Sequence, residues 1–447
     1  MVPVLTPLLA LFADAALLLT GHGLVTTLLP LRVAAGEFSS FAAGTVAAGY
    51  FGGLLVGALV CPAIVRRVGH IRAFAGFAAL FAAATLTLPL FAHPAAWTVV
   101  RVFAGIALAG YTMVAEAWLS AATPAHSRGR VLAVYMVVTY AAIGSAQFLL
   151  VFDEGTFALF SVAALFISLA VLPVVLTRVT APALDAPSGL SLKDLLRVSP
   201  FGVAGSLGAG MVLGAFYGLA PLFAVRQGFA AGQVGYVMAA AILGGLALQW
   251  PVGWLSDVFD RRTVLVCSAA ACALCSLGLL GLGGMGTWPL MALLVAFGGA
   301  SFTLYPIALS HAADNLPDDS DIVSLTSGML LVYGTGSATG PLLGGLLFDL
   351  ADNRGLFFYT AAIGALLALF GLWRMTQRAA PPIEEQSDFV AVPRMTAVSA
   401  GLDPRVPDEE PELPFGAEPV EAAAPDAPVV DVNDDEAPPA AEPRTPS

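Results

Sequence analysis

The sequence predicts an all-α membrane protein with twelve transmembrane helices in two six-helix lobes. Three observations predict this fold: the composition, the spacing of the apolar runs and an internal repeat. Of the 447 residues, 58% are hydrophobic and only 11% are charged, whereas a soluble domain carries about a quarter charged residues. A chain with so few charges cannot cover a water-exposed surface with polar groups, and this excludes a string of soluble domains.

Twelve apolar runs are long enough to cross a bilayer, which takes about 20 residues at about 1.5 Å of rise each. The first run lacks a basic start and a small-residue cleavage site, so we expect a membrane helix there and not a signal peptide. The runs cover residues 4–31, 41–65, 71–92, 96–121, 131–151, 156–177, 201–225, 231–256, 262–284, 288–312, 321–349 and 355–375.

The two halves of the chain resemble each other at an offset of 191 residues. Residues 109–122 read AGYTMVAEAWLSAA, and residues 300–313 read ASFTLYPIALSHAA. Parallel repeats of six helices are typical of two-lobed transporters, in which the site lies between the lobes. Chance resemblance between Ala- and Gly-rich helices is the alternative. The predicted parts are a lobe at 1–177, a cytoplasmic linker at 178–200, a lobe at 201–378 and a tail at 379–447.

Basic residues predict the orientation, because cytoplasmic loops carry an excess of Lys and Arg. With the N-terminus inside, only Arg32, Arg226 and Arg354 lie on the outer side, and Arg101 lies just within the membrane. Both termini are therefore expected in the cytoplasm. The inner side then carries Arg66, Arg67, Arg72, Arg128, Arg130, Arg178, Lys193, Arg197, Arg261, Arg262, Arg374 and Arg378.

The acidic net charge of −12 comes from the C-terminal part of the sequence. Residues 379–447 carry a net charge of −13 and contain 14 prolines, whereas residues 1–378 carry a net charge of +1. Such a composition buries too little apolar surface to fold, so we expect a disordered tail. It is either a plain solvated tail or a segment with a regulatory interaction. A basic patch for nucleic acid is missing.

Several motifs resemble the major facilitator superfamily, and the resemblance covers nearly all of residues 4–375. Residues 253–262, GWLSDVFDRR, are similar to the loop signature of that family, and residues 101–105, RVFAG, to its fourth-span motif. Residues 340–345, GPLLGG, look like its antiporter motif. The segments FYGLAPLF, SFTLYPIALSHA and SRGRVLAVYM also resemble its YcaD-type bacterial branch. The resemblance implies transport by alternating access.

Two of these motifs predict structural roles. In the loop motif, Asp257 can accept hydrogen bonds from amides at the start of the next helix, and nearby arginines can hold it by charge. These contacts would form a latch that is made in one conformational state of the transporter and broken in the other. The alternative is an ordinary loop whose acid caps the next helix. The latch residues are Gly253, Asp257, Arg261 and Arg262. Close helix packing, with or without a coupling role, is predicted for Gly340, Pro341, Gly344 and Gly345.

Ionisable residues inside the membrane are the candidate functional groups, because a charge there costs about 2.5–3.5 kcal/mol on insertion scales. At about 100° per residue, Arg101, Thr112 and Glu116 share one helix face. Depth predicts an inner carboxylate pair, Asp14 and Glu116, and an outer pair of His22 and Arg101. The alternative for each of the four is a buried structural group. The predicted substrate and proton pathway contains Asp14, His22, Arg101, Thr112, Glu116, Tyr217 and Tyr305.

The sequence therefore predicts a secondary active transporter of a small solute in the bacterial inner membrane, coupled to protons through Glu116, with efflux by antiport favoured. The alternatives are a proton-independent facilitator and a non-transporting scaffold or sensor that uses the acidic tail. Neither a phosphate-binding GxxxxGK[ST] motif nor a catalytic or metal-ligating constellation is present, so we expect no enzyme, cofactor or metal. We expect a monomer whose partners are the solute, protons and lipid, and no nucleic acid.

Overall fold

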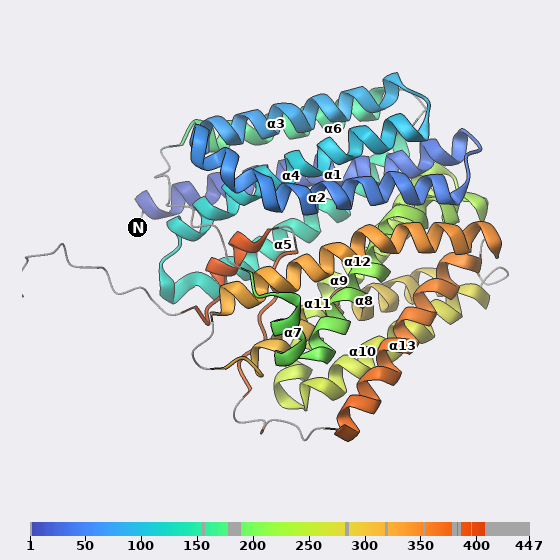
Figure 1. The fold of residues 1–447 in the computed structure, drawn as a ribbon. Coiled ribbons are helices and arrows are strands. Elements are labelled where there is room, and N and C mark those ends of the chain that lie inside the picture. The colour runs from blue at the N-terminus through green and yellow to red at the C-terminus, as the bar shows by residue number, and fades with distance from the viewer. Residues whose placement is uncertain are drawn as a thin grey trace, which may run out of the picture. The chain divides into compact units, whose positions relative to one another are not determined.

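The computed structural model describes residues 2–153, 157–177, 189–281, 286–317, 321–351, 354–377, 382, 386–394 and 396–406. Its long elements are all helices (Figure 1), and twelve of those in the described ranges are long and apolar enough to cross a membrane. The predicted fold class is confirmed. The chain is a multi-pass membrane protein.

The helices match the predicted apolar runs to within a few residues at most ends. The short helix α7, Leu192–Val198, lies in the predicted linker and begins after the capping residue Ser191. In the first half the helices are α1 (Val2–Ala35), α2 (Ser40–Val68), α3 (His70–Thr87), α4 (Pro94–Ala122), α5 (Arg128–Ala146), which continues as the 3₁₀ helix η3 (Gln147–Phe152), and α6 (Ala158–Val175). In the second half they are α8 (Pro200–Arg226), α9 (Ala231–Val258), α10 (Arg261–Gly281), α11 (Thr287–Ala313), α12 (Ile322–Leu350) and α13 (Gly355–Gln377).

The same helix pairings recur in both halves. In the first half α1 packs against α5, α2 against α4, and α3 against α6. In the second half the corresponding partners meet, with α8 against α12, α9 against α11, and α10 against α13. The repeat in the sequence is thus a repeat of the fold, and chance resemblance between apolar helices does not explain it.

The two halves meet closely at the end of the bundle where α1 joins α2, which we call the α1–α2 end. A Cβ atom on Gly44 would lie 2.2 Å from the carbonyl oxygen of Pro341, so the backbones of α2 and α12 touch. The Asp349 carboxylate near the end of α12 accepts hydrogen bonds from the amides of Ser40 (2.8 Å) and Phe41 (2.9 Å). One helix therefore caps the start of another across the two halves.

A second contact closes the α1–α2 end on the other side of the bundle. A Cβ atom on Gly235, in α9, would lie 2.3 Å from the carbonyl oxygen of Gln147, in η3. The Gln147 side chain is itself buried and accepts a hydrogen bond of 2.6 Å from Thr27, in α1. Small residues at such crossings let the helices approach without a layer of side chains.

The segment of residues 386–394 and 396–406, which we call the C-terminal strap, differs from the expectation of a disordered tail. Its 3₁₀ helix η6 (Ala397–Leu402) contacts α4 and α5 of the first half and α12 of the second (Figure 1). Val390, Val392 and Leu402 are buried. The strap packs because it contains an apolar run, FVAVP, that the rest of the tail lacks. Residues 407–447 lie outside the described residues.

We predict that Gly44→Ala loosens the α1–α2 end, because the added methyl group cannot fit against Pro341. Gly52→Ala is the matched control on the same helix, since a Cβ atom there has nothing within 4 Å. The measurement is the rate at which a maleimide labels Ala47→Cys, beside Gly218, in protein whose four native cysteines are replaced by serine. Labelling should rise severalfold with Gly44→Ala and stay unchanged with Gly52→Ala. Equal rates in the two variants would show that the contact does not close this end.

Candidate functional site

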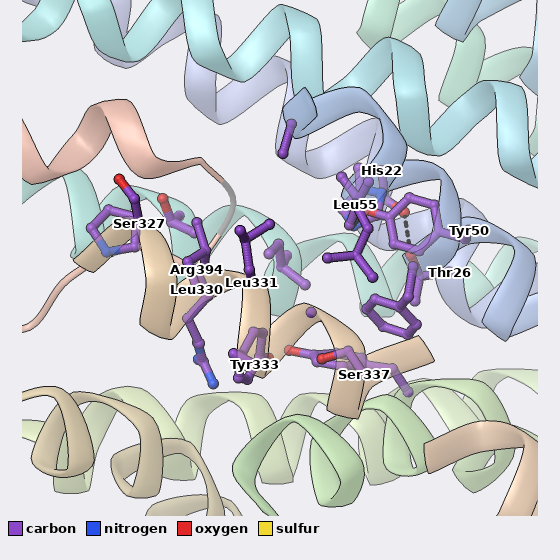
Figure 2. Close-up of a pocket in the computed structure, with 18 of the residues that line it drawn as sticks. His22, Thr26, Tyr50, Leu55, Ser327, Leu330, Leu331, Tyr333, Ser337 and Arg394 are labelled. Atoms are coloured by element: carbon purple, nitrogen blue, oxygen red, sulfur yellow. Dashed lines mark hydrogen bonds between the residues drawn. The ribbon is translucent and has the colours of Figure 1, made fainter. Parts of the chain in front are cut away.

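A cavity of about 200 Å³ lies between the two halves of the bundle. Its walls come from α1, α2, α5, α8 and α12, and the strap contributes Pro393 and Arg394. Figure 2 shows His22, Thr26 and Tyr50 on one side of the cavity, and Tyr333, Ser337 and Arg394 on the other. An aromatic, mostly apolar cavity with a few polar groups is typical of a small-molecule site.

The predicted outer pair, His22 and Arg101, is joined by Tyr50 of α2. The Tyr50 hydroxyl lies 3.2 Å from His22 Nε2, and the two rings stack with their centroids 5.3 Å apart. The Arg101 guanidinium carbon lies 4.0 Å from the centroid of the same ring, which is a cation–π contact. Tyr50 was not among the predicted pathway residues.

The carboxyls of the predicted inner pair are both fully buried, and each accepts a hydrogen bond from a tyrosine. Asp14 accepts one from the Tyr111 hydroxyl, and Glu116 accepts one of 3.2 Å from the Tyr135 hydroxyl. Tyr135 also lines the same small pocket as Asp14, so it lies near both acids. The second oxygen of Glu116 accepts a hydrogen bond from Thr396 of the strap.

The three remaining pathway candidates have different positions. Thr112 donates a hydrogen bond of 2.8 Å to Leu108 in its own helix and lines a small pocket next to Asp14. Tyr217 lines the cavity. Tyr305 is fully buried behind it, with its ring centroid 4.9 Å from that of Tyr333, which does line the cavity. Tyr305 thus supports the wall from behind.

The glycines of the GPLLGG motif pack α12 against two helices at once. A Cβ atom on Gly340 would lie 2.3 Å from the Met211 carbonyl oxygen of α8, and one on Gly344 would lie 3.1 Å from Ala215 Cβ. On the other side of the helix, Gly345 and Pro341 face the start of α2. This geometry fits the predicted packing role; a coupling role stays a prediction.

Arg261 is the centre of a polar cluster at the end of the bundle where α2 joins α3, which we call the α2–α3 end. Its Nη1 donates to both oxygens of Asp314, at 2.8 and 2.7 Å. Its Nη2 donates to Asp257 (2.9 Å) and to the carbonyl oxygen of Ser387 in the strap (2.6 Å). The cluster therefore joins α9, α10, α11 and the strap. Asp314 was not predicted, because it follows α11 and matches no motif.

The amide at the start of α10 is capped by Asp260 and not by Asp257 as expected. Asp260 accepts hydrogen bonds from the Arg262 amide (3.0 Å) and guanidinium (2.8 Å). Burial would raise the pKa of Asp260, but these hydrogen bonds outweigh it and hold the pKa below its ordinary value. Asp257 instead accepts a hydrogen bond of 2.8 Å from the amide of Phe389 in the strap.

Gly253, the first residue of the loop motif, makes room for the strap. A Cβ atom there would lie 2.4 Å from the Phe389 ring. Of the four predicted latch residues, Gly253, Asp257 and Arg261 thus contact the strap, whereas Arg262 pairs with Asp260.

Comparison with known protein families identifies the family of this chain. The family model described as Major Facilitator Superfamily matches residues 11–319 and, in a second match, residues 226–404. The chain belongs to this superfamily. It is therefore a transporter of a small molecule and not an enzyme. The uncharacterized MFS-type transporter YcaD of Salmonella typhi is 31% identical over 380 residues, which cover 84% of this chain and 97% of that one. The YcaD protein of Escherichia fergusonii is 30% identical over 382 residues, covering 84% and 98%.

Solved transporter structures share the fold at low sequence identity. The nucleoside transporter NupG aligns with a TM-score of 0.65 and 15% identity, covering 83% of this chain and 99% of its own. A bacterial homologue of the human lysosomal transporter Spinster, inward-facing and occupied, aligns with a TM-score of 0.66 and 15% identity, covering 85% and 97%. The D-xylose-proton symporter aligns with a TM-score of 0.63 and 14% identity, covering 85% of this chain and 99% of its own.

We predict that Asp257→Asn loosens the strap, because the neutral amide loses its charge-assisted hydrogen bond with Arg261. The measurement is maleimide labelling of Val392→Cys, a strap position that is 1% exposed, in protein without the native cysteines. Labelling should rise severalfold. Asp194→Asn makes the same change in α7, where the carboxylate is 48% exposed and contacts Arg197 (3.4 Å) and the Ser191 hydroxyl but not the strap; it should leave the rate unchanged. If Asp257→Asn also leaves it unchanged, Asp257 does not hold the strap.

Proposed function

We propose that this protein is a secondary active transporter of the bacterial inner membrane that works by alternating access and moves its solute in exchange for protons. The observation that carries the proposal is the cavity between the two repeated halves, closed at the α1–α2 end by contacts between those halves. Alternating access requires a central site that is closed at one end of the bundle at a time.

The excess of Arg and Lys at the α2–α3 end supports a cytoplasmic location for that end. With this orientation both termini are cytoplasmic, and the cavity is sealed from the outside. Residues 1–177 and 201–378 then act as the two lobes that rock. Opening to the outside requires the contact of Gly44 with Pro341 and the cap made by Asp349 to break.

Glu116 is the proton carrier in this proposal, with Asp14 as its neighbour through Tyr135. Burial disfavours the charged form of a carboxyl, so a carboxyl that is buried in one state and hydrated in another changes its proton occupancy. The hydroxyl partners of Glu116 can hold either form, because a hydroxyl both donates and accepts.

The free energy released by proton movement is large enough to drive solute accumulation. Each proton that crosses 100 mV releases about 2.3 kcal/mol, enough for a solute gradient of about fiftyfold. One solved structure of this fold is a D-xylose-proton symporter. Its likeness to this chain supports proton coupling on the same framework. Efflux by antiport is favoured because the GPLLGG motif resembles that of antiporters.

We predict that Glu116→Gln abolishes proton-coupled accumulation but keeps solute exchange, because the amide fills the same space and cannot release a proton. The assay uses proteoliposomes with a trapped pH-sensitive dye and a panel of nucleosides, pentoses and small organic cations. A solute that moves protons with the wild type should move none with Glu116→Gln, while counterflow of labelled solute persists. Asp194→Asn is the matched acid-to-amide control. Proton movement at the wild-type rate in Glu116→Gln would remove Glu116 from the pathway.

A further inference from the structure

The central cavity contains an aromatic cage that already holds a cation from the chain itself. The Arg394 guanidinium carbon lies 5.0 Å from the ring centroid of Phe302 and 5.9 Å from those of Tyr140 and Tyr333. One of its nitrogens donates a hydrogen bond to the Tyr140 hydroxyl. The three rings come from α5, α11 and α12, so both halves of the bundle contribute to the cage.

The charge of Arg394 is met by ring faces and not by an acid. Among the residues that the structure describes, no carboxylate forms an ion pair with Arg394. Its Nη1 nitrogen is buried and has no hydrogen-bond partner there. Ring faces without a carboxylate recognise guanidinium ions, whose charge is delocalised and weakly hydrated, and quaternary alkylammonium ions. The site is therefore suited to a cation and offers little to an anion.

The strap, which contains Arg394, forms hydrogen bonds with both halves of the bundle. On one side of Arg394, the Ser387 amide and hydroxyl donate to Asp314, and the Phe389 amide donates to Asp257. On the other side, Thr396 donates to Glu116, and Arg128 donates to the carbonyl oxygen of Val406. A segment that ties α9 and α11 to α4 and α5 opposes any movement of one half against the other.

We propose that the cage of Tyr140, Phe302 and Tyr333 is the binding site for an organic cation with a guanidinium or alkylammonium group, and that Arg394 occupies it as an internal pseudosubstrate. The substrate class rests on the proposed transport function. The strap must leave before the substrate binds, and its departure also frees the proton carrier Glu116 from Thr396. Binding of the substrate and occupancy by Arg394 thus compete for one site.

The test is calorimetric titration of the full-length protein in detergent with butylguanidinium, a mimic of the arginine side chain. Butylurea, which has the same shape without the charge, is the matched probe. Removal of an internal competitor tightens apparent binding by the reciprocal of the fraction of sites that the competitor had left free, so about tenfold where about a tenth were free. Arg394→Ala and a truncation after Glu385 should each bind butylguanidinium at least about tenfold more tightly than the wild type. Neither should bind butylurea more tightly.

Three further variants distinguish cation binding in the cage from an effect of a generally loosened protein on the affinity for butylguanidinium. Arg394→Lys keeps a cation in place and should stay close to the wild type. Truncation after Val406 keeps the whole strap and should also leave the affinity unchanged. Phe302→Leu added to Arg394→Ala should reverse the gain, because it removes the closest ring face.

Two results would overturn the proposal. One is an affinity for butylguanidinium that is the same in Arg394→Ala and the wild type. The other is an equal gain for butylguanidinium and butylurea, which would mean an unblocked apolar cavity without a cation site. Because the titration uses no gradient, a loss of proton coupling in Glu116→Gln and a failure of cation binding are separate outcomes.

Discussion

The backbone contact between α2 and α12 is the constraint on which the other features depend. Gly44 and Pro341 meet without a side chain between them, and Asp349 ties the end of one helix to the start of the other. Because the contact is backbone to backbone, the halves cannot come closer at that end. The free volume between them lies further along the bundle, where the cavity and the strap are found. Where the halves touch therefore determines where a solute can be held.

Four buried charges in the described part of this bundle have aromatic partners, in contrast to the ion pair of Arg261 with Asp314. Such partners stabilise a charge without fixing it, because a ring face or a hydroxyl is not itself left charged when the ion changes. A buried ion pair, by contrast, leaves an uncompensated charge when one member is lost. A transporter interior has to be filled and emptied repeatedly, and neutral partners suit that use. The pairs are Asp14 with Tyr111, Glu116 with Tyr135, Arg101 with Tyr50, and Arg394 with Tyr140.

The framework could be read from the sequence because its determinants are local. The length of each apolar run predicts a membrane helix. The repeat at an offset of 191 residues predicts that the two halves share one arrangement of helices. The site could be read only in part. Asp14, His22, Arg101 and Glu116 were found because charge is rare in apolar runs, but their partners Tyr50 and Tyr135 carry none. Asp257 was found by its motif, whereas its contact with the strap depends on residues about 130 positions away. The strap was missed because the average composition of residues 379–447 conceals the short run FVAVP.

The place of the strap in the chain order has a consequence for biogenesis. It follows the last membrane helix, so the ribosome synthesises it after every helix to which it binds. A nascent chain therefore inserts both halves with the central cavity vacant, and fills that cavity only when synthesis has passed Arg394. Any chain released before that point would be a complete bundle with an open interior. The central cavity is thus filled from within only after the helices that line it have been made.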